Sequence, residues 1–144
     1  MKFHFWYTFL SIFLMALGSV GYLWLSANGR LVTWVPLADF FLMAFAVMRL
    51  VRLFTYDIIT DFIRGWFVGA EPDSLRGTLG ALINCPWCTG MWFALLVVFF
   101  YFATPNIAWY VILVLALSAL ATSLQILANL IGWSAEIKKR GVQP

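Results

Sequence analysis

Two cysteines three residues apart, in the segment Cys85-Pro86-Trp87-Cys88, have the sharpest chemical potential in this sequence. Cys85 is predicted to be the N-cap of a helix and Pro86 its first residue, which places Cys88 within the first turn. Unpaired backbone N–H groups and the positive end of the helix dipole lower the pKa of a thiol at such a position. Disulfide oxidoreductases use the same spacing, so Cys85 and Cys88 are candidates for redox chemistry or metal binding.

Three interpretations of this pair remain open. A redox role requires a partner for electron relay, but the chain has only these two cysteines, whereas membrane-bound quinone-linked thiol oxidases carry a second pair. Structural zinc usually takes four ligands, and the chain adds only the distant His4 unless two protomers share one site. The structural interpretation is simplest, because buried cysteines behave as small hydrophobic residues that pack and cap a helix. We therefore predict no metal and no other cofactor.

The composition indicates that the elements around this pair lie in a lipid bilayer. Of the 144 residues, 64% are hydrophobic and only 10% are charged, whereas about 25% are charged in a typical soluble domain. Lipid can solvate apolar side chains that water cannot. The net charge of +3 comes from basic residues at the ends of apolar runs, a pattern that orients membrane proteins. We expect the lipid bilayer as a partner and no nucleic acid.

Four apolar segments are predicted to cross the bilayer, at residues 5–26, 36–54, 86–103 and 107–131. The first is long enough for a hydrocarbon core of about 30 Å and too long for a signal peptide. The second contains Asp39 near its start and two arginines near its end, whose long side chains can reach the interface. The fold class is therefore all-α, a single four-helix membrane bundle.

Between the second and third spans the pattern changes. Apolar residues recur at helical spacing over residues 57–68, with acidic and basic residues on the opposite side, which predicts one amphipathic helix on the membrane surface. We expect a loop over residues 70–80, a short interfacial or re-entrant segment at 78–84, and a charged tail over residues 134–144.

The distribution of positive charge orients these spans. With the N-terminus inside, every basic residue except Arg30 is cytoplasmic; these are Lys2, Arg49, Arg52, Arg64, Arg76, Lys138, Lys139 and Arg140. Since cytoplasmic segments are enriched in lysine and arginine, both termini are predicted to be cytoplasmic.

Polar side chains gather toward this predicted cytoplasmic end. Ser118, Thr122, Gln125 and Asn129 share one face of the fourth span, and this face should point into the protein or a partner, because polar groups need partners in hydrocarbon. Interhelical hydrogen bonding explains the face most simply, and a polar cavity is the alternative. Ionisable residues near this depth indicate a functional site, unless the arginines only meet lipid phosphates or pair with nearby aspartates. The candidate polar cluster comprises Arg49, Arg52, Asp57, Asp61, Arg64, Gln125 and Asn129.

The order of these motifs resembles a known family of small bacterial and phage membrane proteins. The resemblance spans residues 38–102, leaves the first and fourth spans unmatched, and rests on Met48-Arg49-Leu50-Val51-Arg52-Leu53, Asp57-Ile58-Ile59, Arg64 and Cys85-Pro86-Trp87-Cys88-Thr89-Gly90-Met91-Trp92. It is a YjcA-like, sporulation-associated family with a domain of unknown function. The resemblance implies a bacterial or phage source, and therefore the inner (plasma) membrane, but no activity.

We see no nucleotide-binding loop, catalytic triad or metalloprotease motif in the sequence. The sequence favours a non-enzymatic membrane protein that acts by homo-oligomerisation or as a subunit of a larger membrane assembly. The alternatives are a thiol-redox protein that uses Cys85 and Cys88, and an oligomeric lysis protein or small transporter.

Overall fold

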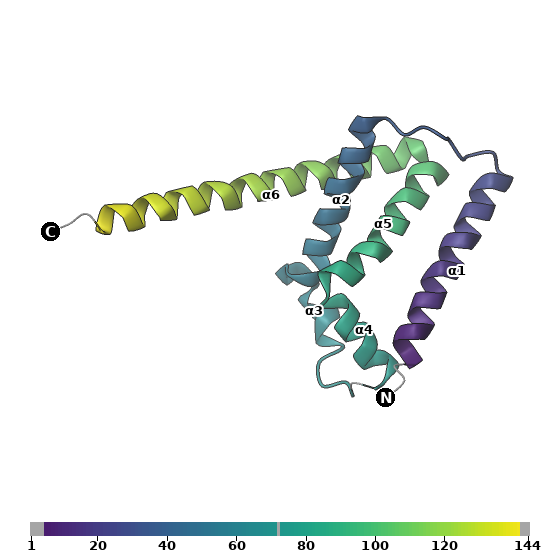
Figure 1. Ribbon diagram of the computed structural model, residues 1–144, viewed down its shortest axis with the longest axis horizontal. Coiled ribbons are helices and arrows are strands. Elements are labelled where there is room, and N and C mark those ends of the chain that lie inside the picture. The colour runs from purple at the N-terminus through teal and green to yellow at the C-terminus, as the bar shows by residue number, and fades with distance from the viewer. Residues whose placement is uncertain (1–4, 72, 142–144) are drawn as a thin grey trace.

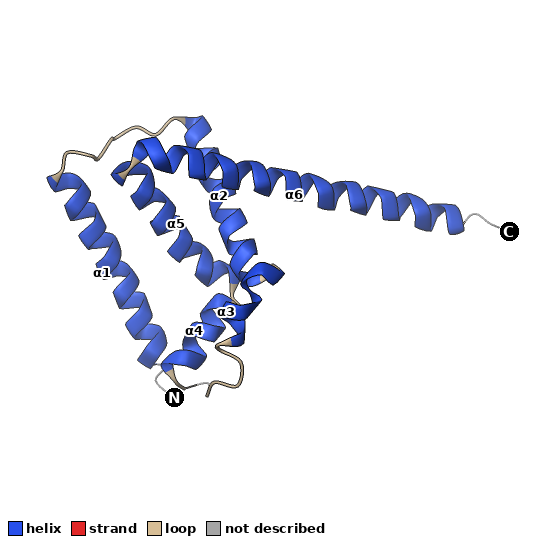
Figure 2. Cartoon of the chain, turned by 180° about the vertical axis from the view of Figure 1, so that it is seen from behind, coloured by secondary structure: helices blue, strands red, loops and turns tan. Residues whose placement is uncertain are grey.

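The computed structural model describes residues 5–71 and 73–141, which form helices, turns and loops without a strand. The all-α fold predicted from the sequence is confirmed. Figures 1 and 2 show the helices, which in chain order are α1 (Phe5–Ala27), α2 (Leu37–Thr55), the 3-10 helix η1 (Ile58–Thr60), α3 (Asp61–Gly65), α4 (Leu75–Ile83), α5 (Pro86–Ala103) and α6 (Pro105–Arg140).

The central helix of the fold is α2, which packs against both α5 and α6. The hydrophobic core lies where these three helices meet and consists of Met43, Ala46, Val97, Ala108 and Ile112. On the far side of α5 lies α1, while α3 and α4 close the end of the molecule near the N-terminus (Figure 1). Both views show that α6 crosses α2 near its own start and then extends away from the other helices.

Three helices, α1, α5 and α6, are long and apolar enough to cross a membrane. The prediction of four spans is thus met for three of them. The α2 helix has a suitable length of 19 residues but contains the charged residues Asp39, Arg49 and Arg52, whereas α1 and α5 contain none and the charges of α6 lie at its C-terminal end. The 36-residue α6 is about 54 Å long at 1.5 Å per residue, well beyond the thickness of a hydrocarbon core.

The segment after α2 differs from the single amphipathic helix predicted over residues 57–68. It is divided into η1 and the five-residue α3, because Thr60 adopts φ −107° and ψ 10° at their junction. The Thr60 hydroxyl donates back to the carbonyls of Leu53 and Asp57, which favours a turn over a continuous helix. Gly69 ends this segment with a φ of +75°, a conformation that glycine adopts without strain.

Two further segments are more helical than predicted. Part of the expected loop over residues 70–80 belongs to α4, since the Ser74 side chain caps this helix by accepting a hydrogen bond of 3.0 Å from the backbone N–H of Gly77. The predicted tail from residue 134 continues α6 as far as Arg140.

Candidate functional site

The Arg64 side chain joins the end of α2 to α3. Its guanidinium donates to the carbonyls of Phe54 at 3.1 Å and Asp57 at 2.9 Å, and to the carboxylate of Asp61 at 3.1 Å. The last carbonyls of a helix have no partner within the helix, and a basic side chain near the C-terminus can satisfy them. Arg64 therefore serves as a structural cap of α2.

Arg49 lies beside this cap at the end of α2. Its side chain forms an ion pair with Asp57, with Arg49 Nη1 and Asp57 Oδ2 3.0 Å apart, and the two side chains are 19% and 26% exposed. The structure therefore brings together four of the seven predicted cluster residues, Arg49, Asp57, Asp61 and Arg64, which we call the Arg–Asp unit.

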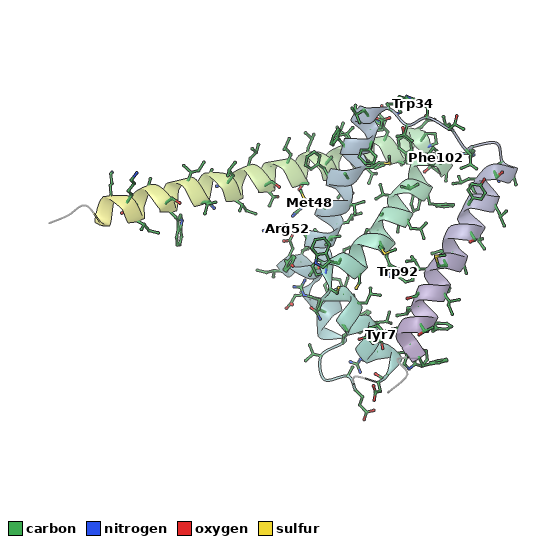
Figure 3. The ribbon with its side chains drawn as sticks, in the orientation of Figure 1. Tyr7, Trp34, Met48, Arg52, Trp92 and Phe102 are labelled. Atoms are coloured by element: carbon green, nitrogen blue, oxygen red, sulfur yellow. The ribbon has the colours of Figure 1, made fainter. Side chains whose placement is uncertain are left out.

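Arg52 has a different environment from Arg49. The exposed Arg52 lines a pocket of about 480 Å³ between the C-terminal half of α2, the start of α5 and the middle of α6. Figure 3 shows Arg52 and Met48 one turn apart on α2. The pocket is lined by Met48, Arg49, Val51, Arg52, Tyr56, Pro86, Trp87, Ala119, Thr122 and Ser123.

The Cys85-Pro86-Trp87-Cys88 motif adopts the predicted cap geometry at this pocket. Cys85 is the N-cap of α5, its Sγ accepts from the backbone N–H of Cys88 at 3.4 Å, and Pro86 begins the helix. The two Sγ atoms lie 2.7 Å apart, and both cysteines are free thiols. Hydrogen bonds from the Cys88 side chain and backbone N–H lower the pKa of the Cys85 thiol. The motif thus presents a thiol that ionises more readily than usual.

A metal site at the two thiols would need further ligands close to them. Among the residues that the structure describes, no three histidine, cysteine, aspartate or glutamate residues lie close enough to hold a metal ion. The distant candidate His4 lies outside the described residues.

The predicted convergence of Gln125 and Asn129 with the arginines does not occur within one chain. Both side chains are exposed, and Gln125 Nε2 donates to Asn129 Oδ1 at 3.1 Å. In the sequence they follow Ser123, the last α6 residue of the pocket lining, within the exposed residues 123–139. Figures 1 and 2 show that the later part of α6 extends away from the other helices.

Three polar contacts between helices were not predicted. The Tyr101 hydroxyl on α5 donates to Asp39 Oδ2 on α2 at 2.6 Å, which gives the acidic residue in the first turn of α2 a partner. The Thr55 hydroxyl donates to the Ile83 carbonyl at 3.1 Å, and the Thr89 hydroxyl to the Leu82 carbonyl at 2.6 Å. Tyr101 and the two threonines follow no periodic pattern in the sequence. Only the need of the Asp39 carboxylate, in a largely apolar segment, for a polar partner signalled the first contact.

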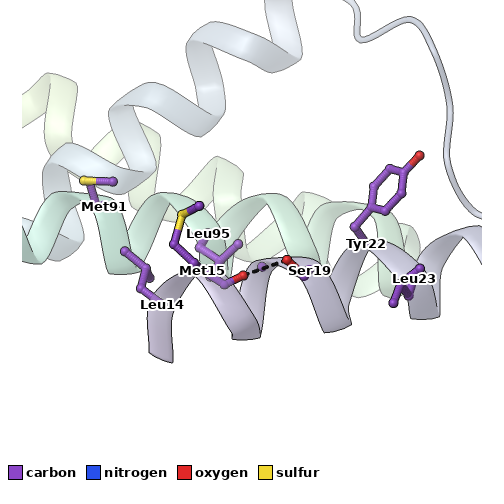
Figure 4. Close-up of a pocket in the computed structure, with 8 residues that line it drawn as sticks. Leu14, Met15, Ser19, Tyr22, Leu23, Met91 and Leu95 are labelled. Carbon is purple, nitrogen blue, oxygen red and sulfur yellow. Dashed lines mark hydrogen bonds between the residues drawn. The ribbon is translucent and has the colours of Figure 1, made fainter. Parts of the chain in front are cut away.

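A second depression, of about 560 Å³, lies between α1 and α5 (Figure 4). Its lining is largely apolar, and the Ser19 hydroxyl within it already donates to the Met15 carbonyl at 2.9 Å. This surface offers contacts to lipid tails but little chemistry. The pocket at Arg52 contains charged and hydroxyl side chains and is therefore the candidate site.

Comparison with known proteins connects this site to a family. The family model described as a protein of unknown function, DUF1360, matches residues 42–128, more than half of the chain. The chain belongs to the DUF1360 family. The match confirms the resemblance and extends it into α6, which the quoted motifs did not cover.

Two relatives of this DUF1360 protein come from Bacillus subtilis (strain 168). The sporulation protein YjcA is 29% identical over 104 residues, an alignment that covers 61% of this chain and 88% of that protein. The UPF0713 protein YngL is 32% identical over 90 residues, covering 55% of this chain and 69% of YngL. No solved structure matches the chain significantly. The family match includes the Arg64 cap, the thiol motif and the whole pocket lining.

Proposed function

We propose that this DUF1360 protein is a non-enzymatic, four-span protein of the bacterial inner membrane, with both termini in the cytoplasm, that acts by self-association through α6. The observation that carries the proposal is the exposure of residues 123–139 on a helix that leaves its own bundle. The two relatives from Bacillus subtilis support a bacterial source, and the three helices long and apolar enough to cross a membrane support a membrane location.

The packing of α2 supports the fourth span. Charges in hydrocarbon are tolerated when they are paired within the protein, and Asp39 accepts from Tyr101 while Arg49 pairs with Asp57. The third charge, Arg52, lies in the last turn of α2, from which a long side chain reaches the interface. Because α2 also contributes Met43 and Ala46 to the core, it is well suited to cross the bilayer with its neighbours.

One face of the exposed part of α6 is suited to a second copy of the chain. Gln125, Ala128, Asn129 and Gly132 share this face by their i, i+3, i+4 and i+7 spacing. Ala128 and Gly132 form a small-x-x-x-small pair, which lets two helices approach closely, and a side chain added at Gly132 would meet open space.

The two amide side chains on this face can pair with the same two side chains of a second α6. Gln125 uses one N–H of its side chain and Asn129 uses its carbonyl oxygen in their mutual bond. The Gln125 carbonyl oxygen and the Asn129 N–H groups can then bond to the opposite groups of a second α6. Since hydrogen bonds between polar side chains of neighbouring helices stabilise their association, pairing of two α6 helices would stabilise a homo-oligomer.

Cross-linking in native membranes tests this proposal. Because interhelical hydrogen bonds contribute about 0.6 kcal/mol each and Leu at a close-approach position separates the helices, we expect partial loss of the cross-linked oligomer in Gln125→Leu and near-complete loss in Gly132→Leu. Ser134→Leu makes a polar-to-apolar change on the opposite face and should cross-link like the wild type. Equal cross-linking in all four proteins would refute association through this face.

A thiol-redox function is the second candidate, favoured by the direct contact of the two thiols and the lowered pKa of Cys85. A Cys85→Ser/Cys88→Ser variant separates the two proposals. Self-association predicts unchanged cross-linking and unchanged function in cells, whereas a redox function predicts loss of function while the oligomer persists.

A further inference from the structure

The pocket between α2, α5 and α6 carries an unbalanced positive charge. Its lining contains Arg49 and Arg52 but no acidic residue. Asp57 neutralises the first by its ion pair at 3.0 Å. Among the described residues, no hydrogen bond or ion pair engages the Arg52 side chain, which leaves one guanidinium with five N–H donors for a ligand.

The rest of the lining determines which anion fits this guanidinium. Trp87, 87% exposed, and Tyr56, 62% exposed, stand at the pocket, and such side chains are enriched at the headgroup level of a bilayer. The N-terminal end of α5, which begins at Pro86, adds the positive end of a helix dipole. A guanidinium matches the geometry of a phosphate by paired hydrogen bonds.

The α6 side of the pocket offers acceptors instead of donors. The Thr122 hydroxyl donates to the Ser118 carbonyl at 2.7 Å, and the Ser123 hydroxyl donates to the Ala119 carbonyl at 2.9 Å. Both hydroxyl hydrogens are therefore engaged, but both oxygens can still accept. A ligand that complements the pocket combines a phosphate for Arg52 with hydroxyl groups that donate toward α6.

We propose that this pocket binds the headgroup of an anionic phospholipid, with its phosphate on Arg52 and its glycerol hydroxyls on Thr122 and Ser123. The site rests on the proposed four-span topology, which places the end of α2 at a membrane surface, but it does not require self-association. Phosphatidylglycerol has both groups of this headgroup, whereas phosphatidylcholine lacks the hydroxyls and the net negative charge.

Native mass spectrometry of the full chain in mild detergent tests the site, with dioctanoyl phosphatidylglycerol and dioctanoyl phosphatidylcholine as probes. We expect one phosphatidylglycerol to bind the wild type about tenfold more tightly than phosphatidylcholine. Arg52→Gln should weaken phosphatidylglycerol binding about tenfold, or ~1.4 kcal/mol. Lys139→Gln removes the same charge outside the pocket and should stay within about twofold of the wild type. Equal binding by Arg52→Gln and the wild type, or equal losses in both variants, would overturn the proposal.

Two further experiments identify the source of the phosphate and keep the proposal testable if a variant does not fold. Displacement of the lipid by an equal concentration of glycerol 3-phosphate would assign the pocket to a soluble phosphate compound and overturn the lipid proposal. If Arg52→Gln fails to fold, Thr122→Val still tests the site, because it should reduce the preference for phosphatidylglycerol over phosphatidic acid several-fold. An unchanged preference would contradict the proposed pose. Gln125→Leu should retain lipid binding, so a failure of the self-association proposal can be distinguished from a failure of the lipid site.

Discussion

Replacing Arg64 with alanine should destabilise the protein more than any other single loss of charge in the Arg–Asp unit. The side chain is 16% exposed and donates to the carbonyls of Phe54 and Asp57 at 3.1 and 2.9 Å. Loss of two partly exposed hydrogen bonds from a charged donor corresponds to about 2–3 kcal/mol. The ion pair with Asp61 adds little, because that carboxylate is 73% exposed.

Thermal unfolding of the purified protein, followed by circular dichroism, measures this loss. For a chain of this size, 1 kcal/mol shifts Tm by roughly 2–4 °C, so Arg64→Ala should lower Tm by roughly 4–12 °C. Asp61→Asn is the matched control and should lie within about 2 °C of the wild type. If Arg64→Ala unfolded at the temperature of the control, Arg64 would not be a structural cap of α2.

Three other substitutions test separate contacts. Gly80→Ala should lower Tm by several degrees, because its Cβ would lie 2.9 Å from Phe67 Cβ in a close approach that α4 cannot relieve without moving. Tyr101→Phe removes the 2.6 Å hydrogen bond to the carboxylate near the start of α2 and should cost about 1–3 kcal/mol in the same unfolding assay, since it leaves that carboxylate without its partner. Because the pKa of Cys85 is lowered, the rate of its alkylation by iodoacetamide should reach half its maximum at a lower pH than for free cysteine. Cys88→Ala should raise this midpoint pH. An unchanged midpoint would show that the Cys88 side chain does not lower the pKa of Cys85.

The elements that the sequence predicted well are those with strong local signals. A proline at the first helical position marks the start of α5, which spans the predicted residues, and the cap by Cys85 follows from the same signal. The ion pair of Arg49 with Asp57 was among the anticipated pairings, because few acidic residues lie near the end of α2. Local sequence thus defined both the thiol motif and half of the Arg–Asp unit.

The contacts that the sequence could not predict involve the backbone. Periodicity shows which side chains share a face, but Arg64 binds the carbonyls of Phe54 and Asp57, and every residue has a carbonyl. The Thr60 hydroxyl likewise divides the predicted surface helix by bonding to backbone oxygens. These bonds depend on where the chain turns, which the side-chain pattern does not specify.

The pattern of polar residues also could not predict the direction of α6. The shared face comprises Ser118, Thr122, Gln125 and Asn129. Of these residues only Thr122 lines the pocket beside α2, while Gln125 and Asn129 are exposed. Where a long helix leaves its neighbours depends on crossing geometry. The prediction that this face needs a partner therefore stays a prediction for its outer half, and the proposed partner is a second chain.

The number of spans depends on α2, and its charges make a direct test possible. If α2 crosses the bilayer, the loop before it and the segment after it lie on opposite sides of the membrane; if it does not, both lie on the same side. We therefore expect a membrane-impermeant maleimide to label Asn28→Cys in intact cells but to label Glu71→Cys only after lysis, in a protein whose natural cysteines are replaced by serine. Both positions are exposed, so burial does not explain a difference between them. Equal labelling of the two variants in intact cells would exclude the fourth span and, with it, the membrane-surface position of the Arg52 pocket.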